Sequence, residues 1–418
     1  MAELLFTLYL LSGIAKVFLK FFLGDTFAEI FNTTLIFAAL LVLAGGFQAL
    51  KNIYFKSKLY IVRGSLPVLA LLLTFYVWMV FSLLYTVSPE YSTIKTFLFL
   101  TNLVAFWFPL TYKDFDFQRF VRYFVFIGSV FIVLYLSLVP RSYSAYISEN
   151  VEISAKYLDI GYLAALDVLL LTLLLPYLEM KRWLKLGFIG VNLAAVVITG
   201  ARGPQIFMIM ALLLYVLFNP KIFYRFLDRL DIKKILVITV SVIILAVGLY
   251  NTLGNYTDNI ERNLQRLSLV TDAESSSLSV RVSQIYFAVE KIFQDASNFM
   301  LGSGIGSFGI LYAGEDVRLY PHNIILETWF ELGVVGVMIL LLFFLFYIKK
   351  IKPNSPSFYI FFYLLLNSLK SSSLVDLRIM FGVFACLLIF ANHMKYGKYG
   401  KYGEYGEYGE YGEYGGGK

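Results

Sequence analysis

The sequence is poor in the side chains from which most soluble catalytic and metal sites are built. Its 418 residues include one cysteine, Cys386, and two histidines, His322 and His393. A single cysteine excludes a disulfide framework within the chain and a thiolate metal site. The histidines lie far apart, and neither has a Cys or Asp cluster beside it, a pattern that argues against zinc. We therefore expect no metal site.

Charge is equally scarce. Charged residues make up 15% of the chain and hydrophobic residues 59%, with a mean hydropathy of +0.74, whereas soluble domains are about 25% charged and about 45–50% apolar. The net charge of +7 would suit nucleic acid. However, the basic residues gather in short connections between apolar runs, where they set membrane topology. The composition thus predicts membrane lipids as partners and argues against nucleic acid.

Long apolar runs are abundant. A helix that crosses a bilayer needs about 20 predominantly apolar residues. The runs cover residues 4–23, 28–50, 66–85, 94–110, 120–139, 158–178, 186–199, 206–218, 235–253, 323–347, 358–373 and 379–392. The first contains two lysines and no clear small-residue cleavage site, which favours a retained helix over a cleaved signal peptide. We predict an all-α polytopic membrane bundle of about 12 transmembrane helices.

The connections between the runs alternate in charge. The basic ones are residues 51–63, 113–122, 181–185, 221–234 and 349–352. The positive-inside rule places all of these on the cytoplasmic side, together with both termini. The same rule places Arg202 and the long connection 254–321 on the outer side. Arg202 lies at a break, residues 200–204, between two short runs, and we expect this break to be recessed and lined by protein.

The connection 254–321 is the largest soluble-like segment of the predicted membrane domain, residues 1–394. Apolar residues recur in it at helical spacing, at Leu278, Val282, Ile285, Val289 and Ile292. This pattern predicts an amphipathic helix on the membrane surface or over the end of the bundle. Residues 302–306 alternate glycine with other residues and predict a flexible turn.

The last residues, 395–418, differ in kind from the rest of the chain. They repeat Tyr and Gly with Lys or Glu at a period of three. Such composition is typical of low-complexity segments. We predict a disordered cytoplasmic tail that is dispensable for chemistry.

A few polar residues stand at the predicted outer surface. Arg202 lies at the span break, Arg281 on the amphipathic helix, and His322 at the start of the tenth span, followed by Asn323 and Glu327. A buried arginine needs an anionic partner, and its fork geometry suits phosphate. Two arginines can hold a diphosphate leaving group, and a neutral histidine can accept a hydroxyl proton. The alternative is that Arg202 is an interfacial anchor, Arg281 a solvated residue of the helix surface and His322 a helix-start residue.

Three stretches resemble a known family. Residues 320–336, in which His322-Asn323 is followed by Gly333 and Gly336, resemble the signature of O-antigen ligases and related polymerases. Residues 199–203 are similar to the Ser/Ala-Arg-Gly element of that family. Residues 302–308 resemble the glycine-rich segment before its histidine. Together these stretches cover roughly residues 190–345.

The resemblance implies a metal-independent glycosyltransferase of the inner membrane, with a GT-C-like fold and no cofactor. Its donor is a glycan on undecaprenyl diphosphate, used on the periplasmic side. Arg202 and His322 match two essential residues of the family. Arg281 is the best match for the third, an arginine of the periplasmic loop, with Arg262, Arg266 and Arg318 as competitors. The catalytic candidates are therefore His322, Arg202 and Arg281.

Further residues are candidates for substrate binding. With Arg202 and Arg281, these are Asn323, Glu327 and Arg318. The ligase hypothesis makes lipid A–core oligosaccharide the acceptor, with inversion at the anomeric carbon. Alternatives are a polymerase that extends a second carrier-linked repeat unit, a protein-directed oligosaccharyltransferase, and a non-enzymatic transporter of lipid-linked glycans. The connection 140–156 is short, with Arg141 as its one arginine, and this favours ligase over polymerase.

Overall fold

The computed structural model describes residues 1–24, 26–27, 31–56, 60–138, 156–220 and 276–395. In these ranges the chain is helical and contains no strand. Every predicted span except the ninth coincides with a helix. The ninth, residues 235–253, lies outside the described residues, as do the tail and the first part of the long connection.

The helices of the bundle match the apolar runs closely. They are α1 (Ala2–Leu23), α3 (Thr33–Lys56), α4 (Leu66–Phe81), α5 (Tyr91–Thr111), α6 (Phe117–Leu138), α9 (Tyr157–Leu173), α10 (Arg182–Thr199), α11 (Arg202–Phe218), α18 (Ile324–Ile351), α19 (Pro356–Ser371) and α20 (Arg378–Lys395). Among the described residues, eight helices are long and apolar enough to cross a membrane, α4 being continued by η1 (Ser82–Leu84). The shorter α9, α11 and α19 have 17, 17 and 16 residues. The predicted all-α polytopic membrane protein is confirmed.

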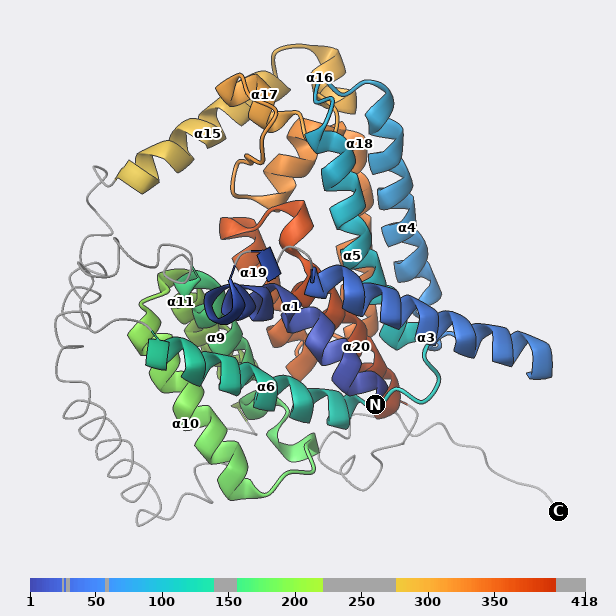
Figure 1. Ribbon diagram of the computed structural model, residues 1–418, viewed down its shortest axis with the longest axis vertical. Coiled ribbons are helices and arrows are strands. Elements are labelled where there is room, and N and C mark those ends of the chain that lie inside the picture. The colour runs from blue at the N-terminus through green and yellow to red at the C-terminus, as the bar shows by residue number, and fades with distance from the viewer. Residues whose placement is uncertain (25, 28–30, 57–59, 139–155, 221–275, 396–418) are drawn as a thin grey trace.

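The bundle has two parts that meet along α19 and α20. Helices α4, α5 and α18 run side by side, and α6, α9, α10 and α11 form a second group (Figure 1). Helix α20 packs against α5, and α19 packs against α11. Aromatic rings fill the centre of the first part, where Phe381 contacts Phe106 and Phe343. This packing brings the end of α19 to the start of α11.

Four of the five basic connections lie at one end of the bundle. The Glu179 N–H donates to Gln118 at 3.0 Å, next to the connection 181–185, and the Asp116 N–H donates to Glu3 near the N-terminus at 2.9 Å. Lys350 lies against Gly64, directly after the connection 51–63. The fifth, residues 221–234, lies outside the described residues. The charge alternation predicts this common end. Its assignment to the cytoplasm stays a prediction of the positive-inside rule.

Short helices cover one end of α18 (Figure 1). They are α15 (Ser276–Ile292), α16 (Ala296–Leu301) and α17 (Phe308–Ala313). Helix α15 confirms the predicted amphipathic helix. Ala288 and Ile292 are buried against the protein, whereas Val282, Ile285 and Val289 each leave about 40% of their surface exposed. Much of the apolar stripe therefore faces outward, as expected for a helix at a lipid surface.

Candidate functional site

Arg202 is positioned by the break between α10 and α11. Helix α10 ends at Gly200, whose φ of 61° is left-handed, and α11 begins at Arg202. Ala201 is buried, and a Cβ on Gly161 of α9 would lie 2.5 Å from its methyl group. Gln205 uses its side chain to satisfy the Val196 carbonyl, which the break releases. The break is therefore buried against α9, as predicted, while Arg202 itself stays half-buried.

A second break divides α18. Gly333 has a φ of 66°, which interrupts the helix, and the preceding carbonyl groups need other partners. Backbone N–H groups of Ser303 and Gly304 donate to the Phe330 and Glu331 carbonyls at 2.8 and 2.9 Å. The Trp78 indole donates to the Leu332 carbonyl at 3.0 Å. The 302–306 segment thus completes the backbone hydrogen bonding of α18.

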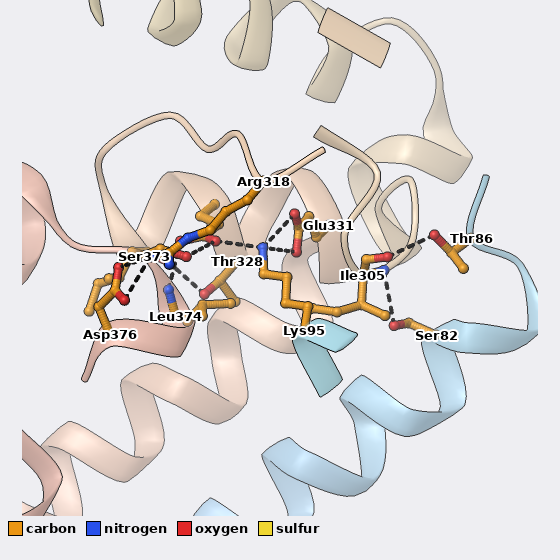
Figure 2. Close-up of polar contacts among 12 residues, drawn as sticks. Ser82, Thr86, Lys95, Ile305, Arg318, Thr328, Glu331, Ser373, Leu374 and Asp376 are labelled. Carbon is orange, nitrogen blue, oxygen red and sulfur yellow. Dashed lines mark hydrogen bonds and ion pairs between the residues drawn. The ribbon is translucent and has the colours of Figure 1, made fainter. Parts of the chain in front are cut away.

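This glycine-rich segment is also held from its other side. Thr86 donates its hydroxyl to the Ile305 carbonyl at 2.8 Å, and the Ile305 N–H donates to Ser82 at 3.2 Å (Figure 2). A Cβ on Gly304 would lie 2.3 Å from the Cα of Thr86. The segment is therefore packed between η1 and α18, and the expectation of a flexible turn is wrong. Its glycines permit close backbone approach.

Three ionisable side chains form a buried cluster beside this segment. Lys95 of α5 donates to Glu327 at 2.6 Å and to both oxygens of Glu331 at 2.7 Å, and all three side chains are fully buried (Figure 2). Glu327 also accepts from the Ser373 hydroxyl at 2.8 Å and the Leu374 N–H at 2.9 Å. Each of the three side chains thus has a polar partner, and the cluster ties α5 and α18 to the connection after α19.

His322 lies directly before α18 in an unusual backbone conformation. Its φ of 55° is left-handed, a region in which histidine is less disfavoured than most residues. The next residue, Asn323, caps α18 by accepting from the N–H groups of Ile325 and Leu326 at 2.9 and 3.0 Å. The cap and the left-handed residue together turn the chain at the start of α18. The Tyr320 ring lies against the imidazole, with 4.6 Å between centroids.

The environment of His322 favours the neutral imidazole. Burial, and secondarily the charge of Arg281, lowers the pKa of His322 below 6.5, while a hydrogen bond to the Ser371 backbone opposes the shift. Its Nδ1 is buried and has no hydrogen-bond partner among the described residues. A neutral imidazole with one unpartnered nitrogen can accept a proton.

Cationic side chains from three separate helices lie near one another beside His322. Arg281 of α15 lies close enough to act on the charge of His322, and both Arg281 and Arg202 act on Lys370 at the end of α19. No carboxylate in the described part of the chain pairs with these three cations. The result is a cationic cluster, defined here as Arg202, Arg281, Lys370 and His322. Such a cluster can bind a multiply charged anion.

The other candidates have partners within the protein. Arg318 donates to both oxygens of Asp376 (Figure 2). Glu327 lies in the buried cluster, and the amide oxygen of Asn323 is used in the helix cap. Arg262 and Arg266, the remaining competitors of Arg281, lie outside the described residues.

Two lysines of this region were not among the sequence candidates. The sequence nevertheless points to Lys95, because an ionisable residue inside an apolar run needs a partner. Glu327 and Glu331 are spaced to share one side of a helix and could supply it. The sequence also points to Lys370, because a basic residue at the outer end of a predicted span departs from the alternation of basic and basic-poor connections. Its proximity to Arg202 depends on how α19 packs against α11.

Helical composition and apolar spans define the class as an all-α polytopic membrane protein. Residues 187–341 match the family model described as O-antigen ligase (Wzy_C). That range nearly coincides with the stretch in which the sequence resembles the family, and the match supports a relationship to the O-antigen ligase superfamily. No curated protein matches the chain. Arg202, Arg281 and His322 lie within the matched range, whereas Lys95 and Lys370 lie outside it.

Proposed function

We propose that this protein is an O-antigen ligase that transfers a glycan from undecaprenyl diphosphate to lipid A–core oligosaccharide at the periplasmic face of the inner membrane. The observation that carries the proposal is the cationic cluster, in which Arg281 lies near a neutral His322, Arg281 and Arg202 both lie near Lys370, and no described carboxylate pairs with these cations. A diphosphate supplies the missing negative charge. The family match supports a membrane enzyme that processes glycans.

The arginines bind and activate the donor. Arg202 and Arg281 contact the diphosphate through charge-assisted hydrogen bonds, which suit the planar guanidinium. As the bond from the anomeric carbon to the phosphate oxygen breaks, negative charge builds on the leaving diphosphate. Because both guanidinium groups are already in place, they stabilise that charge more in the transition state than in the complex with the intact glycan donor. Both arginines therefore act on the rate as well as on affinity.

His322 serves the acceptor. Its Nδ1 takes the proton of the acceptor hydroxyl as that oxygen bonds to the anomeric carbon. The lowered pKa of His322 keeps the imidazole neutral near pH 7, so the nitrogen is available as a base. The oxygen attacks opposite the diphosphate, which inverts the anomeric centre. The proton then passes from the imidazole to solvent or to the departing diphosphate.

Asn323 and Glu327 act through His322 in this scheme. Asn323 fixes the start of α18, and Glu327 holds the connection 373–374, two residues beyond the Ser371 backbone that contacts the imidazole. Both are positioning residues. Arg318 contacts Asp376 and the Tyr320 ring, and through Tyr320 it supports the position of His322.

The proposal is tested in a strain that lacks the gene and is complemented with the wild type, His322→Ala or Arg202→Ala. Loss of a ligase leaves long polymer on the carrier and bare lipid A–core. Loss of a polymerase instead leaves core with a single repeat unit, and loss of a transporter traps carrier-linked units in the inner leaflet. We expect the ligase pattern for the empty strain and both variants, at wild-type protein levels. Full transfer by either variant would overturn the scheme.

A further inference from the structure

Lys370 is the one member of the cationic cluster that has no role in the proposed mechanism. It is the penultimate residue of α19, directly before Ser371, whose backbone contacts His322. Its side chain is exposed, and among the described residues no carboxylate pairs with it. Arg202 and Arg281 are the charged residues that act on it most strongly.

The position of its ammonium group is narrowly defined. Lys370 Nζ lies 2.5 Å from where a Cβ on Gly203 would stand, and its Cδ lies 2.9 Å from the same point. Gly203 is the second residue of α11, so the ammonium lies beside the first turn of that helix and next to Arg202. A glycine at this position leaves the room that the lysine side chain occupies.

The electrostatics of this arrangement favours the binding of an anion. The N-terminus of a helix carries partial positive charge and attracts anions. Here it has an arginine at its first position and a lysine packed against its second, with Arg281 nearby. Like charges repel, and no described carboxylate offsets the repulsion. A multiply charged anion between the three cations removes the conflict.

We propose that Lys370 is a third cation for the donor diphosphate, admitted to the site by Gly203. This inference rests on the proposed function. The arginines supply planar forks, whereas lysine supplies a compact point charge on a flexible stem. Three cations fit the charge of a diphosphate better than that of a monophosphate. Lys370 therefore sets the preference of the site for a diphosphate carrier.

Binding to the purified full chain in detergent tests this role. The probes are geranylgeranyl diphosphate and geranylgeranyl monophosphate, which share one prenyl chain. We expect Lys370→Gln to weaken diphosphate binding roughly 10-fold or more, the size of a lost charged hydrogen bond, and monophosphate binding less. Lys370→Arg should keep most of the affinity. If Lys370→Gln binds each probe as tightly as the wild type does, the inference is overturned.

Gly203→Ala gives an independent test, because its new methyl group displaces the lysine ammonium without requiring a backbone change. We expect it to weaken diphosphate binding as Lys370→Gln does, and to add little in the Lys370→Gln background. Fully additive losses would contradict the inference. Lys291→Gln, which removes a lysine that contacts Gln294 farther along α15, is the matched control and should change little.

Arg202→Ala distinguishes failure of the Lys370 inference from failure of the proposed function. If Arg202→Ala weakens diphosphate binding but Lys370→Gln does not, the Lys370 inference fails and the proposed function stands. If neither substitution weakens it, both fail. Weakening by both, with monophosphate affected less by Lys370→Gln, supports both.

Discussion

The molecule contains two groups of ionisable side chains that differ in burial and in whether they have partners. In the buried cluster, Lys95 is matched by Glu327 and Glu331, and every side chain is fully buried and hydrogen-bonded. The cationic cluster joins Arg202, Arg281, Lys370 and His322, and these side chains are half-buried or exposed. The first cluster is complete in the protein alone. The second has no carboxylate partner among the described residues, and we propose that an anion from outside completes it.

The difference separates a structural role from a binding role. Removing charges from water is costly, so a buried lysine persists only when its partners surround it. Cations that keep contact with solvent can remain unpaired, because water stabilises them until a ligand arrives. Charge pairing together with exposure, rather than charge alone, therefore distinguishes the two clusters.

The two clusters are also connected. Glu327 accepts from Ser373 and Leu374, and the same connection follows Ser371, the last residue of α19, whose backbone contacts His322. Lys370 precedes Ser371 by one residue. The buried cluster thus anchors the segment that presents part of the cationic cluster.

The largest expected effect is on catalysis through His322. We expect His322→Ala to lower the transfer rate by about 10²–10⁴-fold, the usual contribution of a general base. Thermal unfolding in detergent should change modestly, because the substitution removes one hydrogen bond to the Ser371 backbone and the ring contact with Tyr320. Single-turnover rates with a carrier-linked donor give the measurement. An unchanged rate with normal folding would remove His322 from the mechanism.

Breaking the buried cluster should act on stability instead. Lys95→Met leaves two buried carboxylates without their cation, and removing one partner of a buried ion pair costs about 3–5 kcal/mol. We expect a clear drop in the melting temperature and in protein level. The triple variant Lys95→Met, Glu327→Gln, Glu331→Gln leaves no buried charge and should recover much of the loss. Equal instability of the single and triple variants would contradict the ionic explanation.

A smaller loss is expected from the packed glycine segment. Gly304→Ala combines a φ of 88° with a Cβ that would meet the Thr86 backbone. Gly314→Ala is the matched control, because its φ of 78° has the same sign but its Cβ would meet nothing within 4 Å. A left-handed alanine alone costs about 1–2 kcal/mol, so Gly304→Ala should lower the melting temperature further than Gly314→Ala. Equal shifts would argue against the close approach.

The smallest effect is a shift in pH dependence. His322 has a pKa below 6.5, so its neutral form, and with it transfer, should be lost as the pH falls through that lowered value. Arg281 contributes to the lowering, and Arg281→Gln should therefore move the acid limb of kcat/KM to higher pH. Arg318→Gln, which removes a charge paired with Asp376, is the control and should leave the limb in place. An acid limb that does not move in Arg281→Gln would contradict the proximity of the two residues.

Sequence reasoning succeeded where local rules decide the outcome. Apolar runs of membrane length became helices, the apolar spacing near Leu278 predicted α15, and the break before Arg202 appeared where glycine and proline interrupt the runs. The prediction failed at residues 302–306, because glycine signals close backbone packing as well as mobility. Which of the two applies depends on Thr86 and Glu331, which are distant in sequence.

The sequence by itself determined the membrane class, the helical content and the family motifs around Arg202 and His322, since hydropathy, helix propensity and short-range spacing are local properties. Tertiary structure alone decided which charges meet. Lys95 pairs with Glu327 and Glu331 because α5 packs near α18, and Lys370 reaches Arg202 because α19 packs against α11. Electrostatic energy depends on distance in space and on exposure. The pairing that separates the closed ionic cluster from the proposed anion site therefore depends on the folded chain.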